Sequence, residues 1–176
     1  MNIFLVGYRC TGKTTAGKVL SAKLGLEFRD TDQIITAETG MDIAEFVVNW
    51  GWDAFRNKEK QVVSRLCLMD GSVIATGGGA VMDPENLTVM RASGTVIWLR
   101  ASPATIQRRM QYDDRTAASR PSLTGQGSLE EINTVLHERD AVYARAAHHS
   151  LDTDALSIEQ VIEKIMVLAA NNFEPG

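Results

Sequence analysis

The stretch from Gly7 to Thr14 combines residue types at a spacing suited to binding phosphate. It reads Gly-Tyr-Arg-Cys-Thr-Gly-Lys-Thr and matches the pattern G-x-x-x-x-G-K-[ST]. An apolar run at 3–6 precedes it, and apolar residues at helical spacing follow as far as Gly25. In such a loop, backbone N–H groups curl around phosphate oxygens at the positive end of a helix dipole. The sequence therefore predicts a nucleotide-binding loop, with these residues in contact with nucleotide: Gly7, Arg9, Cys10, Thr11, Gly12, Lys13, Thr14 and Thr15.

Within this loop two side chains have predicted roles in phosphate transfer. Lys13 is expected to reach the β- and γ-phosphates and to act in catalysis, and the Thr14 hydroxyl is expected to ligate Mg²⁺. Two carboxylates, Asp30 and Asp32, follow the next expected strand at 26–29. One of them can hold Mg²⁺ while the other accepts the proton of an attacking hydroxyl. For Asp32 the alternative is a helix N-cap; for Asp30 the sequence offers no comparable structural role.

Further along the chain, three groups of residues invite both a functional and a structural interpretation. Gly77-Gly78-Gly79 follows a buried strand and brings backbone N–H groups and open space to a ligand, or else forms a flexible turn. Arg56 and Glu59 share a helix face, where a surface ion pair is the ordinary expectation. Seven arginines and no lysine lie between 100 and 145. About half of them would pair with nearby carboxylates, and the others are candidates for anion contacts.

Expected strands at 3–6, 26–29, 73–76, 95–99 and 149–151 alternate with helical segments. This alternation predicts an α/β fold, with a five-stranded parallel sheet covered by helices on both faces. The polar segment of about 112–127 has no apolar periodicity, so a mobile lid is predicted there. With 176 residues, the chain is expected to form a single domain, 1–176.

Composition excludes several classes of protein. The net charge of −4 argues against nucleic acid as a partner, and no apolar run is long enough to span a membrane. No secretory leader is evident and the two cysteines match no metal spacing, so we expect a cytoplasmic protein with reduced thiols. The three histidines also lack metal spacing and are interpreted as structural. The chain is expected to be a monomer.

Together the motifs resemble those of the shikimate kinase family, along nearly the whole chain. The resemblance rests on the loop Gly7 to Thr14 and on five further motifs, in this order: Asp30-Thr31-Asp32, Phe55-Arg56-x-x-Glu59, Ile74-Ala75-Thr76-Gly77-Gly78-Gly79, Arg120-Pro121 and Glu138-Arg139-Asp140-x-x-Tyr143. It implies a three-layer P-loop kinase fold with an acceptor-binding helical segment at about 32–62. It also implies an enzyme that transfers the γ-phosphate of ATP, with Mg²⁺, to the 3-hydroxyl of shikimate in aromatic amino acid biosynthesis.

The resemblance also implies roles for individual residues. Asp32 would bind the ring hydroxyls and serve as, or orient, the base, and Asp30 would support the Mg²⁺ on Thr14. Arg120 would move in with the lid and neutralise charge on the transferring phosphoryl group, and Arg109 would lie against adenine. The implied shikimate contacts are two arginines that hold the carboxylate and two glycine backbones: Arg56, Arg139, Gly78 and Gly79.

Two features depart from the family pattern. The segment between Arg109 and Arg120 is a few residues longer than in some members, so Arg115 is a second candidate for the role of Arg120. The segment 152–156 lacks the proline that some members place against adenine.

Two other functions compete with this interpretation. A small-molecule kinase of the same fold could act on gluconate or a nucleoside monophosphate, but a carboxylate-bearing acceptor accounts better for Arg56 and Arg139. A nucleotide-dependent switch is less favoured, because the chain has no Asn-Lys-x-Asp guanine motif and its third strand ends in Thr76-Gly77 rather than in an acidic residue.

Overall fold

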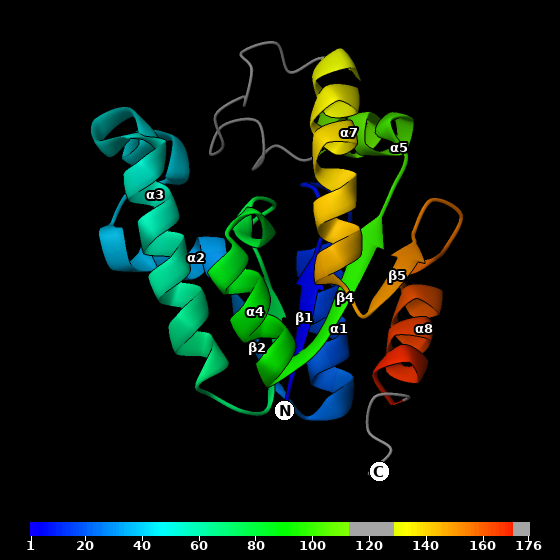
Figure 1. The fold of residues 1–176 in the computed structure, drawn as a ribbon. Coiled ribbons are helices and arrows are strands. Elements are labelled where there is room, and N and C mark those ends of the chain that lie inside the picture. Colours follow the sequence, from blue (N-terminus) through cyan, green and yellow to red (C-terminus); the bar gives the residue numbers. More distant parts are fainter. Residues whose placement is uncertain (113–128, 171–176) are drawn as a thin grey trace.

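The structure is a computed structural model that describes residues 1–112 and 129–170. Strands and helices alternate along the chain (Figure 1). In order they are β1 (Asn2–Val6), α1 (Lys13–Leu24), β2 (Glu27–Asp30), α2 (Thr31–Thr39), α3 (Ile43–Cys67), β3 (Ser72–Ala75), the 3₁₀ helix η1 (Ala80–Met82), α4 (Pro84–Ser93), β4 (Gly94–Arg100), α5 (Pro103–Gln111), α7 (Leu129–Ala146), β5 (His149–Asp152) and α8 (Ile158–Ala170).

The five strands form one sheet in the order β2-β3-β1-β4-β5, and every pairing between neighbours is parallel. The first strand is central, so the loop that follows it leaves the middle of the sheet. Its Phe4 lies level with Ile74 of β3 and Val96 of β4. In an open parallel sheet the strand order reverses beside the first strand, and ligands bind outside the carboxyl ends there.

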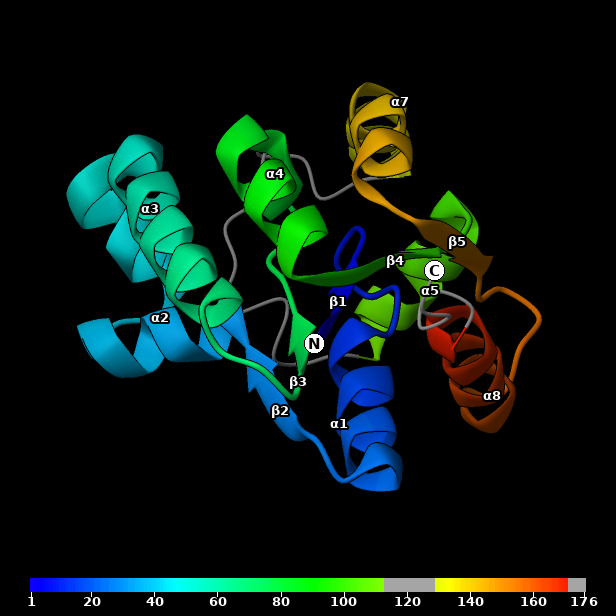
Figure 2. The ribbon, with the colours of Figure 1, turned by 60° about the horizontal axis from the view of Figure 1, so that its bottom comes forward.

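Helices cover both faces of the sheet, which makes three layers (Figure 2). Alternate residues of β1 enter different cores because successive side chains of a strand point to opposite faces. Ile3 and Leu5 pack with α1 and α8, whereas Phe4 and Val6 pack with α3, α4 and α7. The predicted α/β class, with a parallel five-stranded sheet between helices, is confirmed.

Most helix ends coincide with signals in the sequence. Asp42, Asp83 and Ser102 cap α3, α4 and α5 through side-chain oxygens, and proline occupies the first turn of α4 and α5. Helix α3 consists of two helical segments that meet in a kink at Gly51, where the backbone is not helical (φ 81°, ψ 167°). The predicted lid at about 112–127 lies outside the described residues, apart from Tyr112.

Among residues 1–112 and 129–170, no helix is both long enough and apolar enough to cross a bilayer.

Candidate active site

The loop between β1 and α1 curls at the centre of the sheet edge. Cys10 has a positive φ of 59° and Gly12 one of 95°, and left-handed residues of this kind are typical of loops whose backbone N–H groups form a concave anion site. Gly7 must be glycine, because its φ is 138° and a Cβ would lie 2.3 Å from the carbonyl oxygen of Leu99. The Lys13 ammonium donates to the carbonyls of Gly7 and Tyr8 at 2.8 and 2.7 Å. The conformation is that of an anion-binding loop that leads into a helix N-terminus.

Asp30, at the end of β2, has two roles. Its Oδ1 accepts from the backbone N–H groups of Asp32 and Gln33, so Asp30 is the N-cap of α2. Its Oδ2 accepts from the Thr14 hydroxyl at 2.9 Å. The expectation that Asp30 has no structural role is wrong, and the cap considered as an alternative role for Asp32 is Asp30 instead. The cap must precede the first helical residue, and α2 begins at Thr31.

A cavity of about 1430 Å³ opens over this loop. Residues 10–16 line it together with Asp30, Asp32 and Arg109. The Arg109 guanidinium donates to the carbonyl of Cys10 and to both the hydroxyl and the carbonyl of Thr153, at 3.1–3.3 Å. These bonds place a planar cation at the wall of the cavity, between the phosphate-binding loop and the segment after β5.

A smaller recess of about 70 Å³ lies beside the large cavity. All residues that the sequence analysis assigned to the acceptor line it: Asp32, Arg56, Gly78, Gly79 and Arg139. They come from α2, α3, the glycine turn and α7, because the carboxyl ends of parallel strands meet at one edge of the sheet. Asp32 and Ile43 line both cavities. Asp32 is therefore the carboxylate at the boundary between the two spaces.

Arg56 is held on α3 by aromatic and acidic neighbours. Its guanidinium carbon lies 5.3 Å from the ring centres of both Trp52 and Phe55, and its Nη1 donates to Glu59 Oε2. The expectation of a surface ion pair is wrong, because Glu59 is only 1 % exposed. The pKa of Glu59 is raised to about 7, chiefly by burial and in smaller part by the neighbouring charge of Asp32, against the opposing charges of Arg56 and Arg139.

Arg139 and Tyr143, one turn apart on α7, both donate to the carbonyl oxygen of Gly78. The ring of Tyr143 stacks on Trp98 of β4, with centres 5.4 Å apart. The Tyr143 side chain is fully buried. This arrangement connects α7 and the central sheet to the glycine turn.

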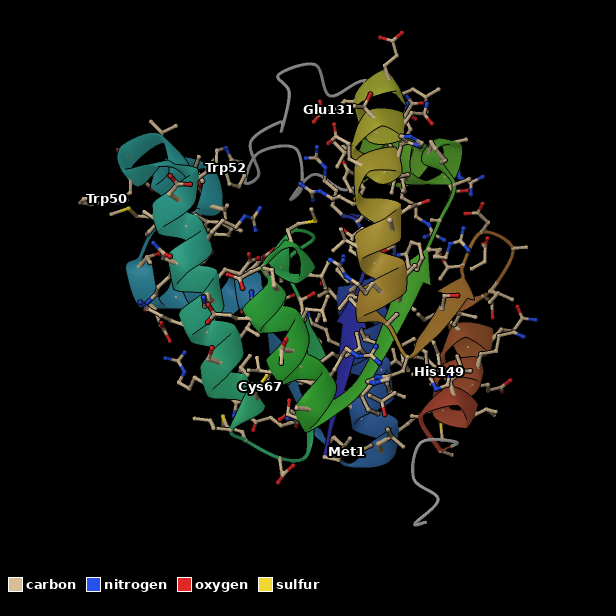
Figure 3. All side chains as sticks on the ribbon, in the orientation of Figure 1. Met1, Trp50, Trp52, Cys67, Glu131 and His149 are labelled. Carbon is tan, nitrogen blue, oxygen red and sulfur yellow. The ribbon has the colours of Figure 1, made fainter. Side chains whose placement is uncertain are left out.

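Arg9 belongs to the phosphate-binding loop in sequence, but its side chain lines the small recess. Its guanidinium forms an ion pair with the buried Glu131 near the start of α7, at 3.3 Å. Figure 3 shows Glu131 and Trp52 toward the same end of the molecule, away from Met1.

Other features of the site were absent from the sequence-based prediction or lie beyond the described residues. Trp52, Thr31 and Tyr143 had no assigned role; Thr31 and Tyr143 stood inside recognised motifs, and that position was the available signal. Arg115 and Arg120 lie outside the described residues. Within the described ranges, no group of three or more His, Cys, Asp or Glu side chains is arranged to hold a metal ion by itself.

The chain is similar to known proteins along nearly its whole length. A sequence model described as shikimate kinase matches residues 9–169. A protein of Yersinia pestis named shikimate kinase 2 is 45% identical over 166 residues, which are 93% of this chain and 94% of that protein. A Yersinia enterocolitica protein of the same name is 42% identical over 169 residues, covering 96% and 95% of the two chains.

Solved structures agree with the sequence comparisons. The structure of shikimate kinase from Acinetobacter baumannii in complex with shikimate superposes with a TM-score of 0.90 at 31% identity, covering 99% of this chain and 95% of that one. Shikimate kinase from Aquifex aeolicus gives a TM-score of 0.83 at 28% identity, with all of both chains covered. A gluconokinase from Sinorhizobium meliloti, at 14% identity and a TM-score of 0.58, shares the fold alone.

Proposed function

We propose that the two cavities at the sheet edge bind ATP and shikimate, and that the γ-phosphate is transferred to the shikimate 3-hydroxyl where the cavities meet. The chain belongs to the shikimate kinase family. The observation that carries this proposal is the place of Asp32, on the wall that the two cavities share. Phosphoryl transfer requires an attacking oxygen in line with the γ-phosphate, together with a group that can take its proton.

The large cavity has the chemistry of a nucleotide site. The phosphates would occupy the curled loop, where backbone N–H groups and the start of α1 offer positive potential. The Lys13 ammonium, which now contacts two loop carbonyls, would turn to the β- and γ-phosphates. Arg109, held by Cys10 and Thr153, would offer its planar face to adenine. We also propose that Arg120 neutralises negative charge on the phosphoryl group during its transfer.

The residues beside the loop fit a magnesium ion. Thr14 Oγ1 and Asp30 Oδ2 are hard oxygen donors that lie 2.9 Å apart at the cavity wall, and Mg²⁺ prefers such ligands with phosphate oxygens and water. We propose that these two residues hold it. The ion would neutralise charge on the β- and γ-phosphate oxygens. The protein's own part is to keep Asp30 fixed as the cap of α2, so that its second oxygen faces Thr14.

The small recess has the chemistry of a site for a carboxylate that also carries hydroxyls. Arg56 and Arg139 provide two guanidinium groups, whose fork geometry suits a carboxylate. The backbones of Gly78 and Gly79 allow close approach of a ring. Glu59 Oε1 is buried without a hydrogen-bond partner among the described residues, and a hydroxylated acceptor could supply one, directly or through water.

Asp32 would accept the proton of the 3-hydroxyl while that oxygen forms its bond to the γ-phosphorus. The bond from this phosphorus to the bridging oxygen of ADP breaks, and the negative charge moves to ADP. Positioning and positive charge account for most of the catalysis.

We further propose that residues 1–176 form one domain, with an acceptor-binding segment at about 32–62 and a lid at about 112–127. We also propose a monomeric cytoplasmic enzyme that has no membrane partner and, in keeping with its net charge of −4, no nucleic acid partner.

The direct test measures ADP release from MgATP in a coupled assay, with shikimate, gluconate, a panel of nucleoside monophosphates or no acceptor. We expect turnover with shikimate alone. Activity with gluconate or a nucleotide instead would leave the nucleotide site in place and refute the acceptor assignment. A slow rate that is indifferent to every acceptor would favour the switch function. In the same assay, Arg56→Ala should raise the KM for shikimate far more than the KM for ATP, and equal effects on both would refute its role.

A further inference from the structure

The glycine turn Gly77–Gly79 lies against the charged groups of the small recess. A Cβ on Gly77 would lie 2.4 Å from Glu59 Oε1 and 2.8 Å from Asp32 Oδ1. A Cβ on Gly79 would lie 2.4 Å from Arg56 Nη2. The turn therefore touches the proposed base and the proposed carboxylate-binding arginine, with no side chain between them. A small displacement of this backbone would change the shape of the recess.

Three consecutive glycines do not hold a conformation by themselves, because glycine has the largest backbone freedom of any residue. The carbonyls of Gly77 and Gly79 are held locally, since they accept from Ala80 and Met82 in η1. The N–H of Gly77 and the carbonyl of Gly78 have no such local partner. Both are satisfied instead by side chains from distant parts of the chain.

Thr31 holds the first of these groups. Its hydroxyl accepts from the Gly77 N–H at 2.8 Å, and its side chain is fully buried. Thr31 lies between Asp30, which contacts Thr14, and Asp32 at the boundary of the two cavities. Residues 30–32 thereby connect the glycine turn to both carboxylates. A shift of Gly77 would break its hydrogen bond to Thr31 at the start of α2.

Tyr143 holds the second group. Its phenol donates to the carbonyl of Gly78, which also accepts from Arg139 at 3.3 Å. Stacking on Trp98 fixes the ring, so the hydroxyl has little freedom. Burial raises the pKa of Tyr143 to about 12, and the phenol remains a donor across the working pH range. Because the same carbonyl receives Arg139, the position of Gly78 also determines where that guanidinium lies.

We propose that Thr31 and Tyr143 are positioning residues that hold the glycine turn from two sides and so set the distance between Asp32, Arg56 and Arg139. Neither hydroxyl is proposed to contact the reacting atoms. Both act through the backbone of Gly77 and Gly78, beside the proposed acceptor. The inference rests on the proposed function for its effect on shikimate, whereas the anchoring of the turn can be measured without any substrate.

The experiment compares Thr31→Val, Thr31→Ser and Tyr143→Phe with the wild-type chain. Valine has nearly the shape of threonine but cannot accept a hydrogen bond, serine keeps the acceptor, and phenylalanine keeps the stacking on Trp98. The control is Ile165→Ala, which opens a cavity in the core on the other face of the sheet and lowers stability without touching the turn. Two readouts are used: amide hydrogen exchange of a peptide covering Gly77–Gly79 without ligand, and the KM values for shikimate and ATP.

We expect Thr31→Val to speed exchange in the glycine peptide and to raise the KM for shikimate about tenfold, because a buried donor is left unsatisfied. The KM for ATP should stay within about twofold of the wild-type value, and Thr31→Ser should restore most of the loss. Tyr143→Phe should raise the shikimate KM about fivefold, since Arg139 still donates to the same carbonyl. Ile165→Ala should lower the melting temperature, without a specific increase in exchange of the glycine peptide or in the KM for shikimate.

Unchanged exchange and an unchanged shikimate KM in both Thr31→Val and Tyr143→Phe would overturn the proposal. It would also fail if the two KM values rose together, or if Ile165→Ala gave the same selective rise. Should Thr31→Val fail to fold, the nearly isosteric Tyr143→Phe decides the matter alone. A wild-type chain that does not phosphorylate shikimate would refute the proposed function, and the exchange data would still decide whether the hydroxyls hold the turn.

Discussion

Replacing Gly79 by alanine should displace Arg56 by a calculable amount. The added Cβ would lie 2.4 Å from Nη2 and 2.6 Å from both Cζ and Nη1, whereas ordinary van der Waals contact begins at 3.4 Å. The guanidinium must therefore retreat by about 1 Å, the difference between 3.4 and 2.4 Å. The φ of Gly79 is −103°, which alanine adopts without strain, so the clash is the main effect of the substitution.

The retreat is costly because it strains the contacts that hold the Arg56 guanidinium in place. Trp52 and Phe55 pack against its guanidinium, and Glu59 holds its Nη1. A hydrogen bond to a charged group contributes about 1.5–3 kcal/mol, and each 1.36 kcal/mol is a factor of ten, so losing one such contact to a carboxylate costs about 10- to 150-fold. A misplacement of about 1 Å can have effects of this size.

The assay is steady-state ADP release with shikimate varied at saturating MgATP, and then with ATP varied at saturating shikimate. We expect Gly79→Ala to lower kcat/KM for shikimate by about 10- to 150-fold and to leave the KM for ATP nearly unchanged. The decisive control is the same substitution in an Arg56→Ala background, where the clashing group is absent. There it should add less than about 0.5 kcal/mol. If the two single effects add fully in the double variant, Gly79 does not act through Arg56 and the argument is refuted.

Four further predictions follow from the structure. Because the pKa of Glu59 is about 7 in the fold against 4.5 unfolded, its contribution to stability is full below about pH 4.5 and is lost, by about 3 kcal/mol, as pH rises through 7. Urea unfolding at pH 5 and pH 8 should reveal this loss, and Glu59→Gln should remove it; an equal loss in the variant would exclude Glu59 as the cause. Asp32→Asn should abolish turnover yet bind ATP normally by calorimetry, and normal turnover would exclude Asp32 as the base. Asp30→Ala should lose about 1 kcal/mol of stability with its cap and also require more Mg²⁺ for activity, whereas the capping control Asp83→Ala should lose only stability; equal Mg²⁺ dependence in the two variants would contradict the metal assignment. Gly17→Ala should destabilise the protein by about 1–3 kcal/mol in thermal unfolding, because its Cβ would lie 2.4 Å from the ring of Phe28; a gain in stability would mean that helix propensity outweighs the clash.

Local patterns predicted the elements of this fold well, since the signals that start and stop a helix act within one turn. Helices α1 and α2 end at Gly25 and Gly40, and α3, α4 and α5 begin after Asp42, Asp83 and Ser102, residue types that favour these positions. The alternative role considered for Asp32, the cap of α2, belongs to Asp30 two residues earlier, because the helix begins directly at the end of β2. Element boundaries at such a junction depend on the neighbouring strand, which local propensity does not describe.

The environment of the charged groups was harder to predict. Arg56 and Glu59 are three residues apart, and that spacing places them on one helix face without deciding whether the face is solvated or buried. Glu59 is buried because the glycine turn and the aromatic side of α3 exclude water from it. The Arg9 side chain lines the small recess and pairs with Glu131, a partner 122 residues away that no local pattern identifies.

The sequence by itself determined the phosphate-binding loop, the alternation of strands and helices, and the motifs that place this chain in its family, because each depends on residue types at short fixed spacings. Only the tertiary structure decided the strand order β2-β3-β1-β4-β5 and the meeting of Asp32, Arg56 and Arg139 around one recess. It also decided the attachment of Gly77 to Thr31 and of Gly78 to Tyr143. These contacts join residues 46 to 65 positions apart. Packing of the whole chain selects such pairs, and the same burial sets the pKa of Glu59.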